Sequence, residues 1–262
     1  MVATVTFDAQ SVVVVTGSSR GLGLEFVRQL LDKTESQVVA TAREPQKAGA
    51  LTALAKQQRN RLKLVALDTG DESSIKAAAE EIANLYSGVD LLINNAGIDE
   101  GVEIPALELG AATYEKILNV NVVGPYLVTR TFVPLLLKRN TRTVVQMSSI
   151  LGSLTRNRLG MTDPKKNPLG NRCIAYQASK AALNMQSSVF ANELRKDKFC
   201  LVSLEPGWVD TDMGGGNARK MGLEKAPTDA HHAISTMLKT IQQLSVEDSG
   251  EFLSIDGKKM DY

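Results

Sequence analysis

The chain has 262 residues, of which 43% are hydrophobic and 23% are charged, an ordinary composition for a globular protein. Thirty lysines and arginines against 29 aspartates and glutamates give a net charge of +1, which excludes the strong basic field of proteins that hold nucleic acid or anionic membranes. No stretch approaches the roughly 18 apolar residues of a membrane span, and two cysteines, Cys173 and Cys200, are too few for a disulfide framework. We therefore expect a cytoplasmic protein with reduced thiols and a small-molecule partner.

Apolar runs alternate with amphipathic segments along the chain, which is the pattern of βαβ units. Strands are predicted at Ser11–Thr16, Gln37–Ala42, Leu62–Leu67, Val89–Ile93, Thr143–Met147, Cys200–Leu204 and Glu251–Ser254. Helices are predicted between them at Leu22–Asp32, Gln46–Gln58, Glu72–Tyr86, Thr113–Leu137, Ile174–Arg195 and Thr228–Leu244. The strands are apolar throughout, as expected when helices cover both faces of a sheet. The prediction is an α/β chain with a single Rossmann-fold domain over residues 1–262, built on a doubly wound, mostly parallel sheet of about seven strands.

Two long segments interrupt this alternation and are predicted as loops. One is an insert, Leu154–Arg172, and the other, Thr211–Pro227, contains the triplet Gly214–Gly216. Both follow strands at the carboxyl edge of the sheet, where doubly wound folds bind ligands. We expect the second segment to be a substrate lid with glycine hinges, whereas the insert either borders the substrate cleft or affects subunit association.

A glycine-rich turn joins the first predicted strand to the first helix. In Thr16–Gly23, Gly17 would permit the tight turn, Gly21 the approach of a pyrophosphate, and Gly23 the close packing of helix on strand. The alternative is an ordinary glycine-rich turn, but its place between strand and helix favours nucleotide binding.

Two arginines lie where a nucleotide ribose is expected. An NAD site usually has an acid at the end of the second strand, whereas this chain has Arg43 there, and Arg20 lies within the glycine turn. Because guanidinium groups bind phosphate through paired hydrogen bonds, the arginines favour NADP(H). The alternative is two solvated surface arginines.

Tyr176 and Lys180 are four residues apart on a predicted helix, so their side chains share one face. A tyrosine has a pKa near 10, and a neighbouring ammonium would help its phenol to exchange protons near neutral pH. Such a pair is more often structural, so its context decides between the two interpretations.

Taken together, these motifs resemble the short-chain dehydrogenase/reductase family over essentially the whole chain. The segment Pro206–Gly215 and the C-terminal Phe252–Gly257 look like the C-factor and sniffer subgroup of carbonyl reductases. The family motifs appear in order at Thr16–Gly23, Asn94–Gly97, Asn121, Ser149 and Tyr176–Lys180.

The resemblance implies roles for these residues. Tyr176 would donate a proton to a carbonyl oxygen, Ser149 would hydrogen-bond that oxygen, and Lys180 would assist the phenol and bind the nicotinamide ribose. Asn121 would complete the catalytic set, with a proton relay through water. The implied cofactor contacts are Gly17, Ser19, Arg20, Gly21, Leu22, Gly23, Arg43, Asp68, Asn95, Ala96, Gly97, Tyr176, Lys180, Pro206, Gly207, Val209 and Thr211.

Asn121 can also be argued from its helix. It falls on an apolar stripe with Ile117 and Val128, so it is predicted to point inward and to need polar partners. Pro125 lacks an N–H, which leaves the Asn121 carbonyl without its helical donor and free to accept from water. The alternative is that Pro125 merely kinks the helix.

Several neighbouring residues have ordinary explanations. Ser148 competes with Ser149 for the serine role, although the family pattern favours the second serine. Asp68 would be either an adenine-side acid or a turn former. Adjacent His231 and His232 lack metal-ligand spacing, so no metal site is expected, and Cys173 near Tyr176 is more often an inert buried thiol.

The sequence therefore predicts an NADP(H)-dependent oxidoreductase that transfers hydride between nicotinamide and a carbonyl or alcohol substrate: an aldehyde, a ketone or a quinone. It is expected to act as a homodimer or homotetramer. The alternative is a catalytically silent NADP-sensing regulatory protein, which usually lacks the tyrosine or lysine that this chain retains.

Overall fold

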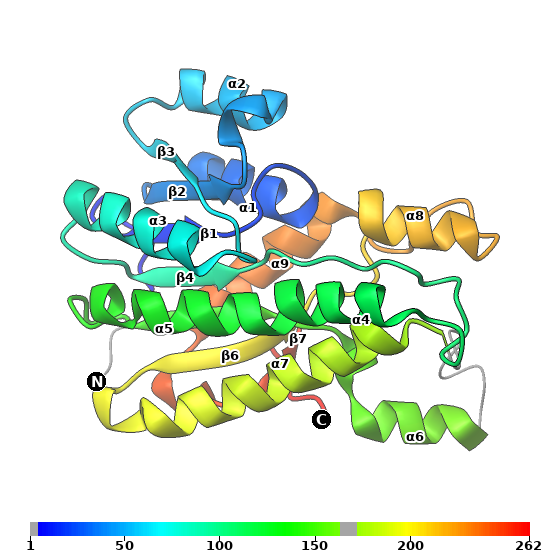
Figure 1. Cartoon of the computed structure of the whole chain (residues 1–262). Helices are drawn as coiled ribbons and strands as arrows, with labels where there is room; N and C mark the ends of the chain where they lie inside the picture. The colour runs from blue at the N-terminus through cyan, green and yellow to red at the C-terminus, as the bar shows by residue number, and fades with distance from the viewer. Residues whose placement is uncertain (1–4, 163–171) are drawn as a thin grey trace.

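The computed structural model describes residues 5–162 and 172–262, which form one sheet covered by helices on both faces (Figure 1). The strands are β1 (Val12–Val15), β2 (Gln37–Ala42), β3 (Leu62–Ala66), β4 (Leu91–Asn94), β5 (Thr143–Met147), β6 (Cys200–Glu205) and β7 (Phe252–Ser254). Their order is β3-β2-β1-β4-β5-β6-β7, and every neighbouring pair is parallel. The predicted fold class is confirmed, and the sheet is wholly parallel.

Helices on both faces explain why the strands are apolar at every position. One face is covered by α1 (Gly21–Lys33), α2 (Gly49–Gln57) and α9 (Ala230–Gln243), and the other by α3 (Glu72–Leu85), α5 (Gly124–Leu136) and α7 (Ile174–Glu193). Val13 and Val15 of β1 pack into the first core, whereas Val12 and Val14 pack into the second. Because successive strand residues point to opposite faces, neither set of valines can be polar.

The strand order reverses between β1 and β4, which lie side by side although β2 and β3 separate them in the chain. Chain connections leave this point toward opposite edges of the sheet, so a crevice opens beyond the carboxyl ends of the two strands. The glycine turn follows β1, and the Asn94–Gly97 motif follows β4. Both motifs therefore meet at the edge where a ligand site is expected.

The predicted helix Thr113–Leu137 is wrong as one continuous α-helix. It divides into α4 (Ala111–Leu118) and α5, which are joined by a π-helical turn, Asn119–Val123. Gly124 donates its N–H to the carbonyl of Asn119, five residues earlier, and Pro125 has no N–H to donate. The turn therefore contains one residue more than a regular α-helical turn.

The predicted loop over the insert Leu154–Arg172 is wrong for its first half, which is helical. Helix α6 (Leu154–Thr162) begins after Ser153, whose hydroxyl accepts from the backbone N–H of Arg156 at 3.1 Å. At the other end, Arg172 forms an isolated antiparallel bridge with Pro105. Residues 163–171 of the insert lie outside the described residues.

The lid segment Thr211–Pro227 contains helix α8 (Asp212–Lys220), so its prediction as a loop is also wrong. The Thr211 hydroxyl caps the helix by accepting from the N–H of Gly214 at 3.2 Å. A Cβ added to Gly214 would lie 2.0 Å from the carbonyl oxygen of Val209, and one added to Gly215 would lie 2.1 Å from a carboxyl oxygen of Asp210. The contact with backbone makes Gly214 necessary for close packing of the helical turn, whereas Gly215 faces the end of the flexible Asp210 side chain. A hinge role for these glycines stays a prediction.

The other predicted elements differ from the structure mainly at their ends. The predicted helix Gln46–Gln58 divides into a 3-10 turn, Pro45–Lys47, and α2. Such shifts of one or two residues are ordinary for helix and strand ends, which fray.

Candidate active site

The glycine turn has the conformation and the crowding that the sequence predicts. Gly17 and Gly21 have φ values of +67° and +56°, which residues with a Cβ rarely adopt. A Cβ on Gly17 would lie 2.8 Å from the Cα of Ala96, and one on Gly23 would lie 2.3 Å from the carbonyl oxygen of Gly17. The turn therefore presents bare backbone at the start of α1, where N–H groups and the helix dipole favour an anion.

The Asn94–Gly97 motif braces this turn from β4. The Thr16 hydroxyl accepts hydrogen bonds from the backbone N–H groups of Asn95 and Ala96, both at 3.0 Å. The Asn95 side chain returns the contact by donating to the carbonyl oxygen of Thr16 at 2.9 Å. These bonds join the carboxyl ends of β1 and β4 and hold the glycine turn against the Asn94–Gly97 motif.

The two arginines predicted to read a 2′-phosphate are both exposed. Arg43 follows β2 directly, and Arg20 lies 3.9 Å from the carboxylate of Asp212 in α8. This ion pair is weak because both side chains are about three-quarters exposed, at 77% and 76%. Asp68 accepts from the N–H of Gly70 at 2.9 Å, which is the bond of the turn-forming alternative.

Helix α7 places Tyr176 and Lys180 together. The Lys180 ammonium lies 5.4 Å from the centre of the Tyr176 ring and donates to the carbonyl oxygen of Met147 at 2.7 Å. Burial raises the pKa of Tyr176, with a further increase from the charge of Asp99, whereas the Ser149 hydroxyl acts to lower it. Burial lowers the pKa of Lys180 to about 8, against the effect of Asp99. The tyrosine is thus a phenol, and the lysine changes its charge near physiological pH.

The structure distinguishes the two neighbouring serines. The Ser148 hydroxyl donates to the side-chain carbonyl of Asn184 at 2.6 Å, in the core beside α7. The Ser149 hydroxyl accepts from the N–H of Leu151 at 3.2 Å and interacts with Tyr176. Because a hydroxyl that accepts one bond keeps its proton to donate, Ser149 is the serine equipped to bind a second oxygen.

Asn121 points inward, as its stripe predicts, and is 1% exposed. Its side-chain amide clamps the backbone of Ile98 by donating to the carbonyl at 2.8 Å and accepting from the N–H at 2.9 Å. It also donates to the Ser179 hydroxyl at 3.1 Å. These contacts join the π-helical turn, α7 and the loop after β4. The water relay at its carbonyl stays a prediction.

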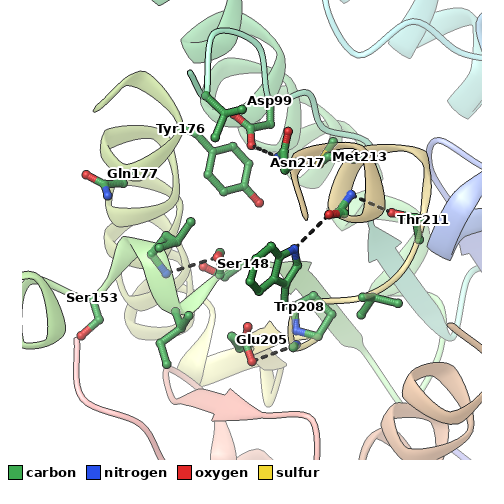
Figure 2. Close-up of a pocket in the computed structure, with 18 of the residues that line it drawn as sticks. Asp99, Ser148, Ser153, Tyr176, Gln177, Glu205, Trp208, Thr211, Met213 and Asn217 are labelled. Carbon is green, nitrogen blue, oxygen red and sulfur yellow. Dashed lines mark hydrogen bonds between the residues drawn. The ribbon is translucent and has the colours of Figure 1, made fainter. Parts of the chain in front are cut away.

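Tyr176 and Ser149 line a cavity of about 300 Å³ at the carboxyl edge of the sheet (Figure 2). The phenol oxygen points into the cavity, and Trp208 faces it (Figure 2). Several residues expected at the cofactor also border this space, among them Leu22, Pro206, Gly207, Val209 and Thr211. The volume is at the lower end of the range for small-molecule pockets.

Two acidic residues of the cavity were missed from the sequence, Asp99 and Glu205. Asp99 lies just beyond the Asn94–Gly97 motif, and burial raises its pKa to about 6. Glu205 ends β6, is 8% exposed, and also has its pKa raised by burial. A sequence signal existed, because each acid follows an apolar strand at the carboxyl edge of a parallel sheet.

Helix α8 forms one wall of this cavity. Asn217 donates to a carboxyl oxygen of Asp99 at 2.8 Å, and Lys220 forms a 2.9 Å ion pair with Glu103. The Trp208 indole N–H donates to the carbonyl oxygen of Gly214 at 3.0 Å. The predicted lid segment therefore does border the cleft, while its closing motion stays a prediction.

In the described parts of the chain, no group of three or more His, Cys, Asp or Glu side chains is arranged to hold a metal ion. His231 instead contacts the carboxylate of Glu25 at 3.0 Å, between α9 and α1. Cys173 and Cys200 are free buried thiols. No helix of residues 5–162 and 172–262 combines the length and apolar character needed to cross a membrane.

Comparison with known proteins gives consistent matches. The model of a family described as short chain dehydrogenase matches residues 11–162. An uncharacterized oxidoreductase of Schizosaccharomyces pombe is 32% identical over 252 residues, covering 93% of this chain and 94% of that protein. The NADPH bound carbonyl reductase from chicken fatty liver is 33% identical, with a TM-score of 0.83 over 97% of this chain and 100% of its own. The carbonyl reductase Sniffer of D. melanogaster is 29% identical, with a TM-score of 0.82 over 97% and 99%.

Proposed function

The chain belongs to the short-chain dehydrogenase family, and on that premise we propose that it is an NADPH-dependent reductase of aldehydes, ketones or quinones. The observation that carries the proposal is the placement of Tyr176, with Lys180 beside its ring, against a cavity that Ser149 also lines. The chicken enzyme with a similar fold is a carbonyl reductase with NADPH bound, which supports the same chemistry here.

In this proposal the residues of the chain bind and protonate the carbonyl oxygen. Ser149 donates a hydrogen bond to that oxygen, and Tyr176 gives it a proton from its phenol. Lys180 is held beside the phenol by its hydrogen bond to the Met147 carbonyl, and its ammonium stabilises the phenolate that remains. NADPH, when bound, supplies the hydride.

The cofactor fits the residues at the switch point of the sheet. Gly17 and Gly23 allow the tight turn and the close packing of helix on strand that a pyrophosphate site needs, because a Cβ at either would meet neighbouring protein atoms at 2.8 Å or less. We propose that Arg20 and Arg43 hold the 2′-phosphate and that Pro206–Thr211 borders the nicotinamide. Asn95, Ala96 and Gly97 would back the adenosine side, the first two held in place by their bonds to Thr16.

Replacing Arg43 with alanine is expected to raise the KM for NADPH roughly tenfold or more and to leave the KM for NADH nearly unchanged. The reason is that only NADPH carries the extra phosphate. Steady-state kinetics with both cofactors checks this, and Arg28→Ala, on the exposed side of α1, is the control for a general loss of positive charge. Equal changes for NADPH and NADH would refute the assignment.

The competing function is a catalytically silent NADP-sensing protein. The two functions differ in one measurement: a panel of aldehydes, ketones and quinones incubated with NADPH and followed at the cofactor absorbance. Turnover of any member supports the reductase. Tight NADPH binding without turnover of any member would favour the sensor.

We also propose that the protein is a homo-oligomer that uses the outer faces of α5 and α7. Met185 and Val189 of α7 are 66% and 54% exposed, and Tyr126 of α5 stacks on Phe190 at 5.8 Å beside them. A contiguous apolar patch of this kind usually marks an interface. A second copy of the chain is the partner we propose for this patch, because in a two-fold dimer the same patch of each subunit packs against its counterpart.

Introducing glutamate at Met185 and Val189 together is expected to convert the oligomer into a monomer, since two charges cannot be buried unpaired. Sedimentation velocity of the wild type and the double variant measures this. Leu107→Glu is the matched control, because Leu107 is fully exposed and belongs to neither helix. A wild-type protein that sediments as a monomer would overturn the proposal.

A further inference from the structure

Asp99 is a charged group without a full set of partners at the wall of the cavity. One of its carboxyl oxygens accepts from Asn217 at 2.8 Å, and the other is buried with no hydrogen-bond partner among the described residues. The charged groups that act on it are Lys180 of α7, Lys220 of α8 and Glu103 of its own loop. The lysines therefore compensate its charge from a distance, not by direct contact.

Glu205 is the second carboxyl group of the cavity. Its Oε2 accepts from the N–H of Gly207 at 2.9 Å, which fixes the carboxylate at the end of β6. Arg156 of α6 is the cation that acts on it. As drawn in Figure 2, Asp99 lies beside the Tyr176 ring, and Glu205 lies beyond Trp208.

The remaining described wall of the cavity is mostly apolar or neutral. Leucine, valine, isoleucine and methionine side chains supply its apolar part together with Trp208, and serine, threonine, asparagine, tyrosine and glutamine side chains supply its neutral polar part. Arg156 is the sole cationic side chain among the described residues that line it, and it is exposed at the surface. The described lining itself carries two acids against one solvated cation, while Lys180 and Lys220, which are not part of the lining, offset part of the charge of Asp99. Asp99 is the acid nearest to the proposed proton donor.

We infer that this cavity selects carbonyl substrates by charge: it takes neutral or cationic molecules and rejects those with an anionic group near the carbonyl, with Asp99 as the main determinant. The inference rests on the proposed function, because it describes the substrate of the same site. An anion placed in the cavity would meet a like charge in a partly desolvated space, where salt screens little. Rejection by a misplaced like charge is a common source of specificity.

The pKa of Asp99 adds a second consequence. Because burial raises this pKa to about 6, the carboxyl group is neutral below that pH and ionised above it. Exclusion of an anion should therefore weaken as the pH falls from 7.5 to 5. Tyr176 and Cys173 also lie near Asp99, and both stay protonated over this range because burial raises their pKa values.

The test uses three benzaldehydes that differ in the charge of the para substituent: 4-carboxybenzaldehyde, methyl 4-formylbenzoate and 4-formyl-N,N,N-trimethylanilinium. The kcat/KM of each is measured with NADPH, and each charged probe is expressed relative to the ester. Asp99→Asn is expected to raise the anion-to-ester ratio by roughly tenfold to a hundredfold, mainly through KM, and to lower the cation-to-ester ratio. Intrinsic reactivity cancels because the same probes are compared between proteins.

Glu100→Gln is the matched control, because Glu100 neighbours Asp99 but pairs with Lys116 outside the cavity. Glu205→Gln reports whether the second acid contributes. If Asp99→Asn fails to fold, the wild-type anion-to-ester ratio between pH 5 and 7.5 tests the same point, and it should rise toward pH 5. The inference is overturned if the ester is reduced while the ratio is unaffected by Asp99→Asn or by pH. Absence of any reduction of the ester, with NADPH still bound, would instead refute the proposed function.

Discussion

Tyr176→Phe is expected to lower kcat by roughly 10²–10⁴-fold while the Kd for NADPH changes little. The substitution removes the phenol oxygen, which is the proposed proton donor, and keeps the ring that packs beside Lys180. Burial raises the pKa of this tyrosine, so the wild-type group carries its proton at neutral pH and is ready to donate it. Stopped-flow or steady-state reduction of an accepted aldehyde gives kcat, and fluorescence titration gives the Kd.

The matched control is Tyr86→Phe, because Tyr86 is the C-cap of α3 and lies away from the cavity. It removes the same oxygen from a half-buried tyrosine and should leave kcat near the wild-type value. A Tyr176→Phe variant that keeps more than about a tenth of the wild-type kcat would rule out Tyr176 as the proton donor.

The second large effect is expected for Lys180→Met, which keeps the length of the side chain and removes the ammonium. We expect kcat to fall by roughly a hundredfold or more and the NADPH Kd to rise, because the ammonium is proposed to serve both the phenol and the ribose. In the wild type, burial lowers the pKa of Lys180 to about 8, so the ammonium is present below that pH and lost above it. Reductase activity should accordingly decline as the pH rises through about 8.

Kinetics and cofactor titration from pH 6 to 9.5 check both parts. The decline near pH 8 should disappear in Lys180→Met, whereas Lys239→Met, on the far helix α9, should retain the wild-type profile. A Lys180→Met variant with a normal NADPH Kd would remove the ribose contact from the proposal. The same decline in wild type and variant would assign it to another group.

Local patterns predicted the sheet and the cradle well, because their causes are local. Strands that are apolar on both faces require helices on both faces. A glycine that a strand-to-helix turn needs can be recognised directly in the sequence. Asn121 was placed inward from its stripe alone, and it is 1% exposed in the structure.

Helix α8 was missed because its stability is not local. Its sequence contains three consecutive glycines, which have poor helix propensity, and tertiary packing overrides that propensity. Gly214 fits so closely against the backbone of Val209 that no larger residue could form the same turn. The periodicity of apolar residues does not report such a packing contact, so Thr211–Pro227 has the sequence pattern of a flexible loop.

The acids of the cavity were missed for a different reason. Asp99 and Glu205 are far apart in the chain, and each looks like an ordinary polar residue after a strand. Only the folding of the sheet edge brings both to the space beside Tyr176. Their joint charge is therefore a property of the assembled site and not of either motif.

The π-helical turn at Asn119–Val123 sets the rotation of α5 about the helix axis relative to α4, and the two helices pack against different neighbours. Residues in a regular α-helix are about 100° apart around the axis, so one extra residue turns everything beyond it by about that angle. Helix α4 can thus face α7, while α5 faces α3 and the sheet. Asn121 lies within this π-helical turn, and from there its side chain donates to both the Ile98 carbonyl and the Ser179 hydroxyl.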